Sequence, residues 1–195
     1  MRFIKRNKPL LITKETMPNP RKFFAKDSVF YITASAENGL PFIPNLLINA
    51  ILRGIIARAQ HLYGQEICHF AFMANHFHLL IKITNPETLS DFVGYIKGKS
   101  ADAINRLLGR DKQTIWCDGF DSPIILDGAK AIEKIIYTYA NPAKARLVNS
   151  IDQYPGLSSW NAFNKGKTTK NIRWIRPSTI TKLPSLEMTH SMQVK

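Results

Sequence analysis

The chain has 195 residues, 45% of them hydrophobic, and its 27 lysines and arginines outnumber its 14 aspartates and glutamates. This length and hydrophobic content exclude a largely disordered chain and fit one domain with tails. The formal net charge of +13 favours an anionic partner, and nucleic acid is the commonest partner of so basic a small protein.

Membrane insertion and secretion are not expected from the sequence. No apolar run reaches the roughly 18 residues that a membrane-spanning helix needs, and the basic N-terminal segment lacks the sustained apolar stretch of a secretory signal. Cys68 and Cys117 form neither a CxxC pair nor a metal-finger spacing. Two isolated cysteines are typical of reduced thiols, so we expect a cytoplasmic protein.

The first half of the chain predicts a basic arm, a strand, a helix and a hairpin. Residues 1–26 carry eight basic residues and one acid, and we interpret them as an N-terminal arm. Residues 28–35 are rich in β-branched and aromatic side chains and predict a strand. Residues 41–63 have apolar side chains at helical spacing and end at a glycine, Gly64. Two strands joined by a tight turn at Ala74–Asn75 then form a hairpin, over residues 65–73 and 76–84.

The second half predicts two helices and a short strand region. A helix spans 88–108, one or two short strands lie within 114–126, and another helix spans 128–139. Asn141–Pro142 is expected to interrupt or end that last helix, because proline disturbs helical hydrogen bonding. Beyond Asn149 the chain has only short apolar clusters in basic, polar surroundings.

This order of elements predicts an α+β fold. Helices interleaved with antiparallel strands are typical of a ferredoxin-like or RRM-like sheet with helices on one face, which leaves the other face for a site or a nucleic acid. We expect three parts: the basic arm at 1–26, a domain at 27–150, and a basic C-terminal extension at 151–195.

The hairpin contains a histidine pair. Side chains on a strand alternate between faces, so His76 and His78 share one face, where two imidazoles can hold one metal ion. A pair of histidines can also simply sit on a sheet surface. The opposite face is predicted to be core, and its residues are Phe77, Leu79, Ile81 and Ile83.

The last helix contains a tyrosine and an asparagine four residues apart. Tyr137 and Asn141 therefore share a helical face; a tyrosine hydroxyl can attack phosphorus, and an amide oxygen can complete a metal site. Asn141 followed by Pro142 is also typical of a helix N-cap with proline at the first helical position. Tyr137 could equally be a core aromatic residue.

Together the two motifs resemble the HUH-type single-tyrosine transposases of the insertion-sequence-200 type, and most of all the REP-associated tyrosine transposases. In that family a strand reads approximately Met-Pro-Asn-His-Val-His-Leu-Leu, and residues 73–80 read Met-Ala-Asn-His-Phe-His-Leu-Leu. A helix there reads Tyr-Ile-x-x-Asn-Pro-Val-x-Ala-Gly-Leu-Val, and residues 137–148 read Tyr-Thr-Tyr-Ala-Asn-Pro-Ala-Lys-Ala-Arg-Leu-Val. The lysine–glycine helix at 96–100 and the tryptophan strand at 116–123 are also similar, so the resemblance spans about residues 28–160.

The resemblance implies a HUH endonuclease fold and metal-dependent cleavage and strand transfer of single-stranded DNA through a 5′-phosphotyrosine, in transposition or in the processing of repeated palindromic elements. It implies a hairpin-forming DNA partner and one Mg²⁺ or Mn²⁺ held by His76, His78 and Asn141. Tyr137 would be the nucleophile rather than Tyr139, which points about 200° away on a helix. Monomers and homodimers both occur among such proteins.

Three departures from the family pattern lie near these motifs. Ala74 replaces a proline, Ala143 a valine and Arg146 a glycine. The arginine–glycine pair that follows the first strand in the family is missing from residues 34–37, which leaves the details of DNA contact open.

Basic clusters and aromatic rings are the predicted DNA contacts. The DNA-binding candidates are Arg21, Lys22, Lys97, Lys99, Arg106, Arg110, Trp116, Lys144, Arg173 and Arg176. Trp116 has a second interpretation, as a core residue or an anchor of its segment.

Two other functions compete with the transposase hypothesis. One is a non-catalytic RRM-like nucleic-acid-binding protein, although the aromatic pattern of an RRM is not visible. The other is a replication or conjugative nuclease with the same chemistry, a class that usually has larger chains and a different order of motifs.

Overall fold

Four strands form one antiparallel sheet in the order β2-β3-β1-β4. The computed structural model describes residues 24–37 and 44–166. The elements, in chain order, are β1 (Val29–Ser35), α1 (Leu46–Tyr63), β2 (Glu66–Phe72), β3 (His76–Lys82), η2 (Pro86–Thr88), α2 (Leu89–Leu107), β4 (Ile124–Ile125), α3 (Gly128–Lys144), η3 (Ile151–Gln153) and α4 (Trp160–Asn164). The expected α+β fold with an antiparallel, ferredoxin-like sheet is confirmed.

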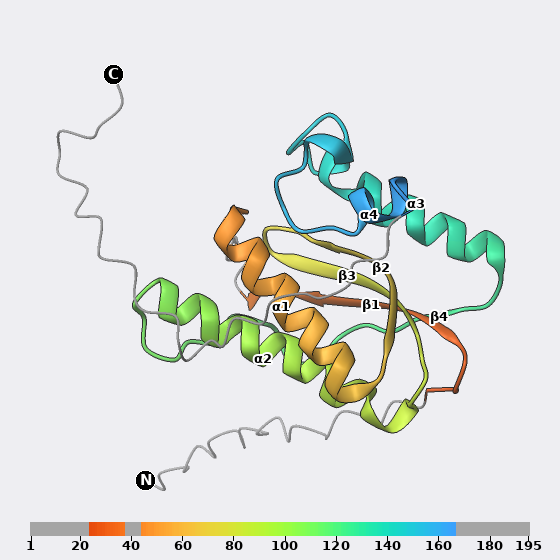
Figure 1. Cartoon of the computed structure of the whole chain (residues 1–195), viewed down its shortest axis with the longest axis horizontal. Coiled ribbons are helices and arrows are strands. Elements are labelled where there is room, and N and C mark those ends of the chain that lie inside the picture. The colour runs from red at the N-terminus through yellow and green to blue at the C-terminus, as the bar shows by residue number, and fades with distance from the viewer. Residues whose placement is uncertain (1–23, 38–43, 167–195) are drawn as a thin grey trace, which may run out of the picture.

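The main core lies between one face of the sheet and the helices α1 and α2. Figure 1 shows these two helices together on one side of the strands. The four alternating apolar residues that were predicted as core, three in β3 and Ile83 just after it, are each 0% exposed and belong to this cluster. The predicted strand region at 114–126 is shorter than expected: it contains β4 and two isolated bridges to the β1 segment, at Trp116 and Asp121.

The last long helix, α3, lies on the opposite face of the sheet. Thr138 in α3 shares a 3.2 Å hydrogen bond with the hydroxyl of Tyr31 in β1, and both side chains are buried. The face that was expected to be free is therefore partly covered, and the expectation of helices on one face holds only for α1 and α2. This placement brings the side chains of α3 onto the face that carries His76 and His78.

Pro142 does not end α3, contrary to expectation. The helix begins at the N-cap Asp127, whose side chain accepts a hydrogen bond from the Lys130 amide, and it continues to Lys144. Pro142 has no amide hydrogen, so one helical hydrogen bond is missing. Because Pro142 lies in the last turn, no further turn of the helix is displaced by the kink that a proline causes. Asn141 is therefore a helical residue in α3 and not the N-cap of a new helix.

The C-terminus of α3 is closed by an arginine in a glycine-like conformation. Arg146 has φ 56°, its amide donates to the Ala143 carbonyl, and the Leu147 amide donates to the Pro142 carbonyl. These two bonds define a Schellman motif, in which glycine is the usual residue at the left-handed position. The family pattern has glycine at this position.

Replacing Arg146 with glycine is expected to stabilise the fold. Relief of the left-handed strain outweighs the greater freedom that glycine gives the unfolded chain, with a net gain of roughly 0.5 to 1 kcal/mol. Urea denaturation measures this gain as a higher midpoint. The neighbouring Ala145 has φ −77°, so Ala145→Gly should instead destabilise, and a stabilising Ala145→Gly would contradict the explanation.

Residues 151–166, the start of the expected C-terminal extension, pack against β2. The Phe72 amide donates to the Leu157 carbonyl at 2.8 Å, and the Tyr154 hydroxyl donates to the Phe72 carbonyl at 2.8 Å. Leu157 is only 3% exposed. Among the described residues, no helix has both the length and the apolar content needed to cross a membrane.

Candidate active site

His76 and His78 lie side by side on the face of β3 turned toward α3. Their ring centroids are 4.7 Å apart. His78 is 4% exposed and His76 is half-buried. The predicted alternation of β3, with histidines on one face and core residues on the other, is confirmed.

Asn141 reaches both imidazoles from α3. Its side-chain nitrogen lies 3.0 Å from Nε2 of His78, and the same amide raises the pKa of His76 as a hydrogen-bond acceptor. Rotation of the amide by half a turn exchanges its nitrogen and oxygen at this position. Asn141 can thus place its amide oxygen, a possible metal ligand, next to two imidazole nitrogens.

The surroundings of His78 keep its ring uncharged and oriented. Burial, followed by the nearby His76 and Lys134, lowers the pKa of His78 to about 3, so the imidazole is neutral at pH 7. Thr33 Oγ1 lies 3.2 Å from Nδ1 of His78, and the ring of Tyr31 stacks on it with centroids 5.4 Å apart. With Nδ1 directed at Thr33, Nε2 is the nitrogen that faces Asn141.

Burial has the same effect, in direction, on the second imidazole. It lowers the pKa of His76, although the hydrogen bond with Asn141 opposes the shift. A neutral imidazole is the form that donates a lone pair to a metal ion. The lowered pKa values therefore favour the neutral form of both histidines, which is the form that can bind a metal ion.

Tyr137 stands at the edge of this group. Its ring centroid lies 5.6 Å from that of His78 and 6.4 Å from that of Tyr31. The side chain is 39% exposed, so a ligand from solvent can reach it. The alternative interpretation of Tyr137 as a core aromatic residue is thereby excluded.

Tyr139 projects from another side of α3. Its hydroxyl lies 2.8 Å from Nδ1 of His69 and 2.9 Å from Oγ of Ser159, and the residue is 6% exposed. Tyr139 therefore ties α3 to β2 and to the C-terminal segment, away from the His76–His78 pair. His69 belongs to this structural network.

The donor set around the histidines fits a divalent cation. Within residues 24–37 and 44–166, no three His, Cys, Asp or Glu side chains gather in a way that could hold a metal. A cation bound by His76 and His78 would thus take its third protein donor from the Asn141 amide. Two imidazoles and one amide leave the remaining coordination positions for water or a phosphate oxygen.

Trp116 is a core residue, which corrects its selection as a DNA-stacking candidate. It is 4% exposed, packs edge-on against Phe77 with centroids 5.0 Å apart, and donates from Nε1 to Ser100 Oγ at 2.8 Å. Burial of both ring and polar group leaves no face on which a base could stack. The second interpretation of this residue is the correct one.

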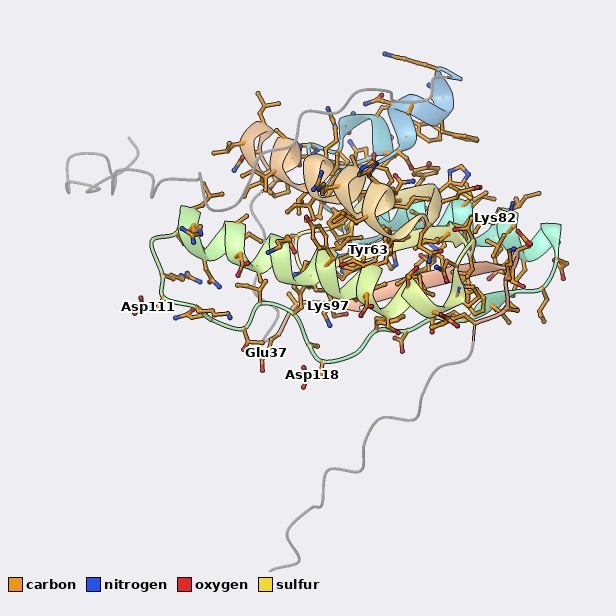
Figure 2. All side chains as sticks on the ribbon, turned by 60° about the horizontal axis from the view of Figure 1, so that its bottom comes forward. Glu37, Tyr63, Lys82, Lys97, Asp111 and Asp118 are labelled. Carbon is orange, nitrogen blue, oxygen red and sulfur yellow. The ribbon has the colours of Figure 1, made fainter. Side chains whose placement is uncertain are left out.

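The other predicted DNA contacts are spread over the molecule. Lys97 donates to the carbonyls of Cys117 and Gly119, and Figure 2 shows it extending from α2 toward the loop that carries Asp118. Lys99 forms an ion pair with Asp102 at 3.8 Å. These lysines and the exposed Arg106 and Arg110 belong to α2 or follow it, across the sheet from α3.

Lys144 is the one described candidate at the site. Its Nζ lies 4.9 Å from the centroid of the Tyr137 ring. Arg21, Lys22, Arg173 and Arg176 lie outside the described residues. Two residues at the site were missed from the sequence, namely Tyr31 and Thr33. The alternation of Tyr31 and Thr33 along β1 was visible, but not the pairing that sets Thr33 opposite His78.

Comparison with protein families gives a match to a transposase family. The family model described as "Transposase IS200 like" matches residues 43–141, which is just over half of the chain and includes both histidines, Tyr137 and Asn141. No curated protein sequence matches the chain significantly.

Solved structures similar to this one include the following two. A REP-associated tyrosine transposase, solved bound to a REP hairpin, has a TM-score of 0.61 at 18% identity, over 86% of this chain and 99% of that one. A candidate transposase from Deinococcus radiodurans R1 has 19% identity over 60% of this chain and 93% of that one. Its TM-score of 0.44 is too low to support an argument, whereas the first similarity establishes a shared fold.

Proposed function

The chain belongs to the family of IS200-like transposases, and from this we propose that it cleaves and rejoins single-stranded DNA with Tyr137 as the nucleophile. Membership of a transposase family already implies an enzyme that cleaves DNA. The observation that supports the finer proposal is the convergence of α3 and β3. Tyr137 and Asn141 come from one helix, and both contact the buried imidazole of His78.

We propose that His76, His78 and Asn141 hold a single Mg²⁺ or Mn²⁺. When bound, such a cation polarises a non-bridging phosphate oxygen and offsets charge in the transition state. Imidazole ligands favour Mn²⁺ over Mg²⁺, because Mg²⁺ prefers oxygen donors. The protein's own part is to keep both imidazoles neutral and to direct Nε2 of His78 toward Asn141.

The chemical step follows from the position of the exposed phenol. The Tyr137 oxygen loses its proton to solvent and attacks the phosphorus, forming an ester with the 5′ phosphate. The bond from phosphorus to the 3′ oxygen breaks, and that oxygen takes up a proton from solvent. Because the ester conserves the bond energy, a second 3′-hydroxyl can reverse the step and join strands without ATP.

Hairpin-forming single-stranded DNA is the proposed substrate. The net charge of +13 favours a polyanion, and the similar REP-associated transposase was solved with a REP hairpin. The decisive test is incubation with labelled single-stranded DNA hairpins of varied sequence, with Mn²⁺ or with a chelator. We expect a covalent protein–DNA adduct that needs the cation. Tight DNA binding with no adduct for any hairpin would favour the non-catalytic RRM-like alternative.

Removal of the Thr33 hydroxyl is expected to weaken metal binding. Thr33→Val keeps the side-chain shape but removes the partner of His78 Nδ1, and loss of such outer contacts typically lowers metal affinity about 10- to 100-fold. Titration with Mn²⁺, followed by electron paramagnetic resonance, measures the change. Thr33→Ser restores the hydroxyl and should recover most of the affinity. If the Thr33→Val and Thr33→Ser proteins bind Mn²⁺ equally well, the Thr33 hydroxyl does not orient the His78 ring.

A further inference from the structure

Two lysines, Lys134 and Lys144, lie on either side of Tyr137 along α3. Lys134, Tyr137, Asn141 and Lys144 follow one another at steps of three, four and three residues, so they share one helical face. Lys134 Nζ lies 5.2 Å from the centroid of the Tyr31 ring and 5.7 Å from that of Tyr137. Since Tyr31 stacks on His78, the Lys134 ammonium lies in the group of side chains around the proposed metal site.

Lys134 has no ion-pair partner among the described residues. The ion pairs found there join Lys82 to Asp27, Lys99 to Asp102 and Lys130 to Glu133. Glu133, its neighbour in sequence, is held by Lys130 at 2.6 Å. Lys134 is half-buried against two phenol rings, whose attraction for an ammonium is weak compared with that of an anion.

An anion is needed to complete this arrangement. A divalent cation at His76 and His78 would be repelled by a nearby ammonium, because like charges in a partly buried site interact strongly. An anionic oxygen placed between the two would attract both. A phosphodiester next to the Tyr137 hydroxyl would provide that oxygen.

We propose that Lys134 is a catalytic residue that contacts a non-bridging oxygen of the scissile phosphate. This inference rests on the proposed function. The Lys134 side chain stabilises the negative charge that develops as the Tyr137 oxygen attacks. Lys144, which is exposed and one helical step beyond Asn141, contacts a neighbouring phosphate and contributes to affinity.

The test separates chemistry from binding. Lys134→Gln is expected to slow adduct formation on saturating single-stranded hairpin DNA by about 100-fold or more, as loss of one charge-stabilising donor does in other enzymes. Its affinity for DNA should change little, and Lys134→Arg should recover part of the rate. Lys144→Gln should instead weaken DNA binding. It should also reduce the slope of log Kd against the logarithm of the salt concentration by about one. The matched control, Lys130→Gln on an exposed turn of the same helix, should change neither quantity.

Mn²⁺ binding by the DNA-free protein distinguishes a catalytic lysine from a structural one. Removing a repelling charge should leave Mn²⁺ affinity in Lys134→Gln equal to or higher than in the wild type. The inference is overturned if Lys134→Gln forms adduct at close to the wild-type rate, or if slower cleavage comes with weaker Mn²⁺ binding. An adduct that persists in Tyr137→Phe would contradict the proposed function itself, so the two failures are distinguishable.

Discussion

Tyr137→Phe is expected to abolish the covalent protein–DNA adduct and strand transfer while DNA binding is retained. The substitution removes a single oxygen from a side chain that is 39% exposed, so the ring contacts with His78 and Tyr31 survive and the fold should be unchanged. Without the hydroxyl there is no atom at this position that can form an ester with phosphorus. Denaturing gels of labelled DNA, followed by mass spectrometry of the linked peptide, measure the loss.

Tyr139→Phe is the matched control for this prediction. It also removes one hydroxyl from α3, but that hydroxyl bonds to His69 and Ser159 rather than facing the histidine pair. We expect Tyr139→Phe to form adduct at Tyr137, with some loss of thermal stability because His69 and Ser159 each lose one hydrogen bond. A DNA-linked peptide modified at Tyr139 would refute the assignment of Tyr137.

His78→Ala is expected to reduce cleavage by about 1000-fold or more, since it removes the ligand at the centre of the proposed metal site. His78 touches Asn141 through Nε2, and its ring packs against Tyr31 and Tyr137. DNA binding should persist, because phosphate contacts come mainly from lysines and arginines. Cleavage assays in Mn²⁺ and in Mg²⁺, together with DNA-binding measurements, test both parts of this expectation.

Two further variants keep this prediction testable if the buried alanine substitution disturbs folding. His76→Ala alters a half-buried residue and should lose cleavage to a similar degree with a smaller effect on stability. His61→Ala, in an exposed position near the end of α1, should leave cleavage unaltered. Near wild-type cleavage by a folded His76→Ala or His78→Ala protein would exclude the proposed metal site.

Local periodicity in the sequence determined the parts of the site that lie within a single element. The period of two along β3 placed His76 and His78 on one face and the core residues on the other, because extended backbone leaves no other arrangement. The helical period placed Tyr137 and Asn141 together and turned Tyr139 away. Gly64 marked the end of α1, where its φ of 69° favours glycine.

Tertiary structure alone decided which elements meet and which side chains are buried. Thr33 and Tyr31 reach His78 only because β1 pairs with β3 across 45 residues of chain, and no local pattern encodes that register. Trp116 can be buried in the core because its ring nitrogen donates a hydrogen bond to Ser100 in α2. Pro142 was tolerated in α3 because it fell in the last turn, where little helix remained to be disrupted. Lys134 took its place between two phenol rings because packing of α3 on the sheet brought Tyr31 beneath it. Such contacts depend on the free energy of the whole fold, whereas the spacing of residues within one strand or helix depends only on backbone geometry.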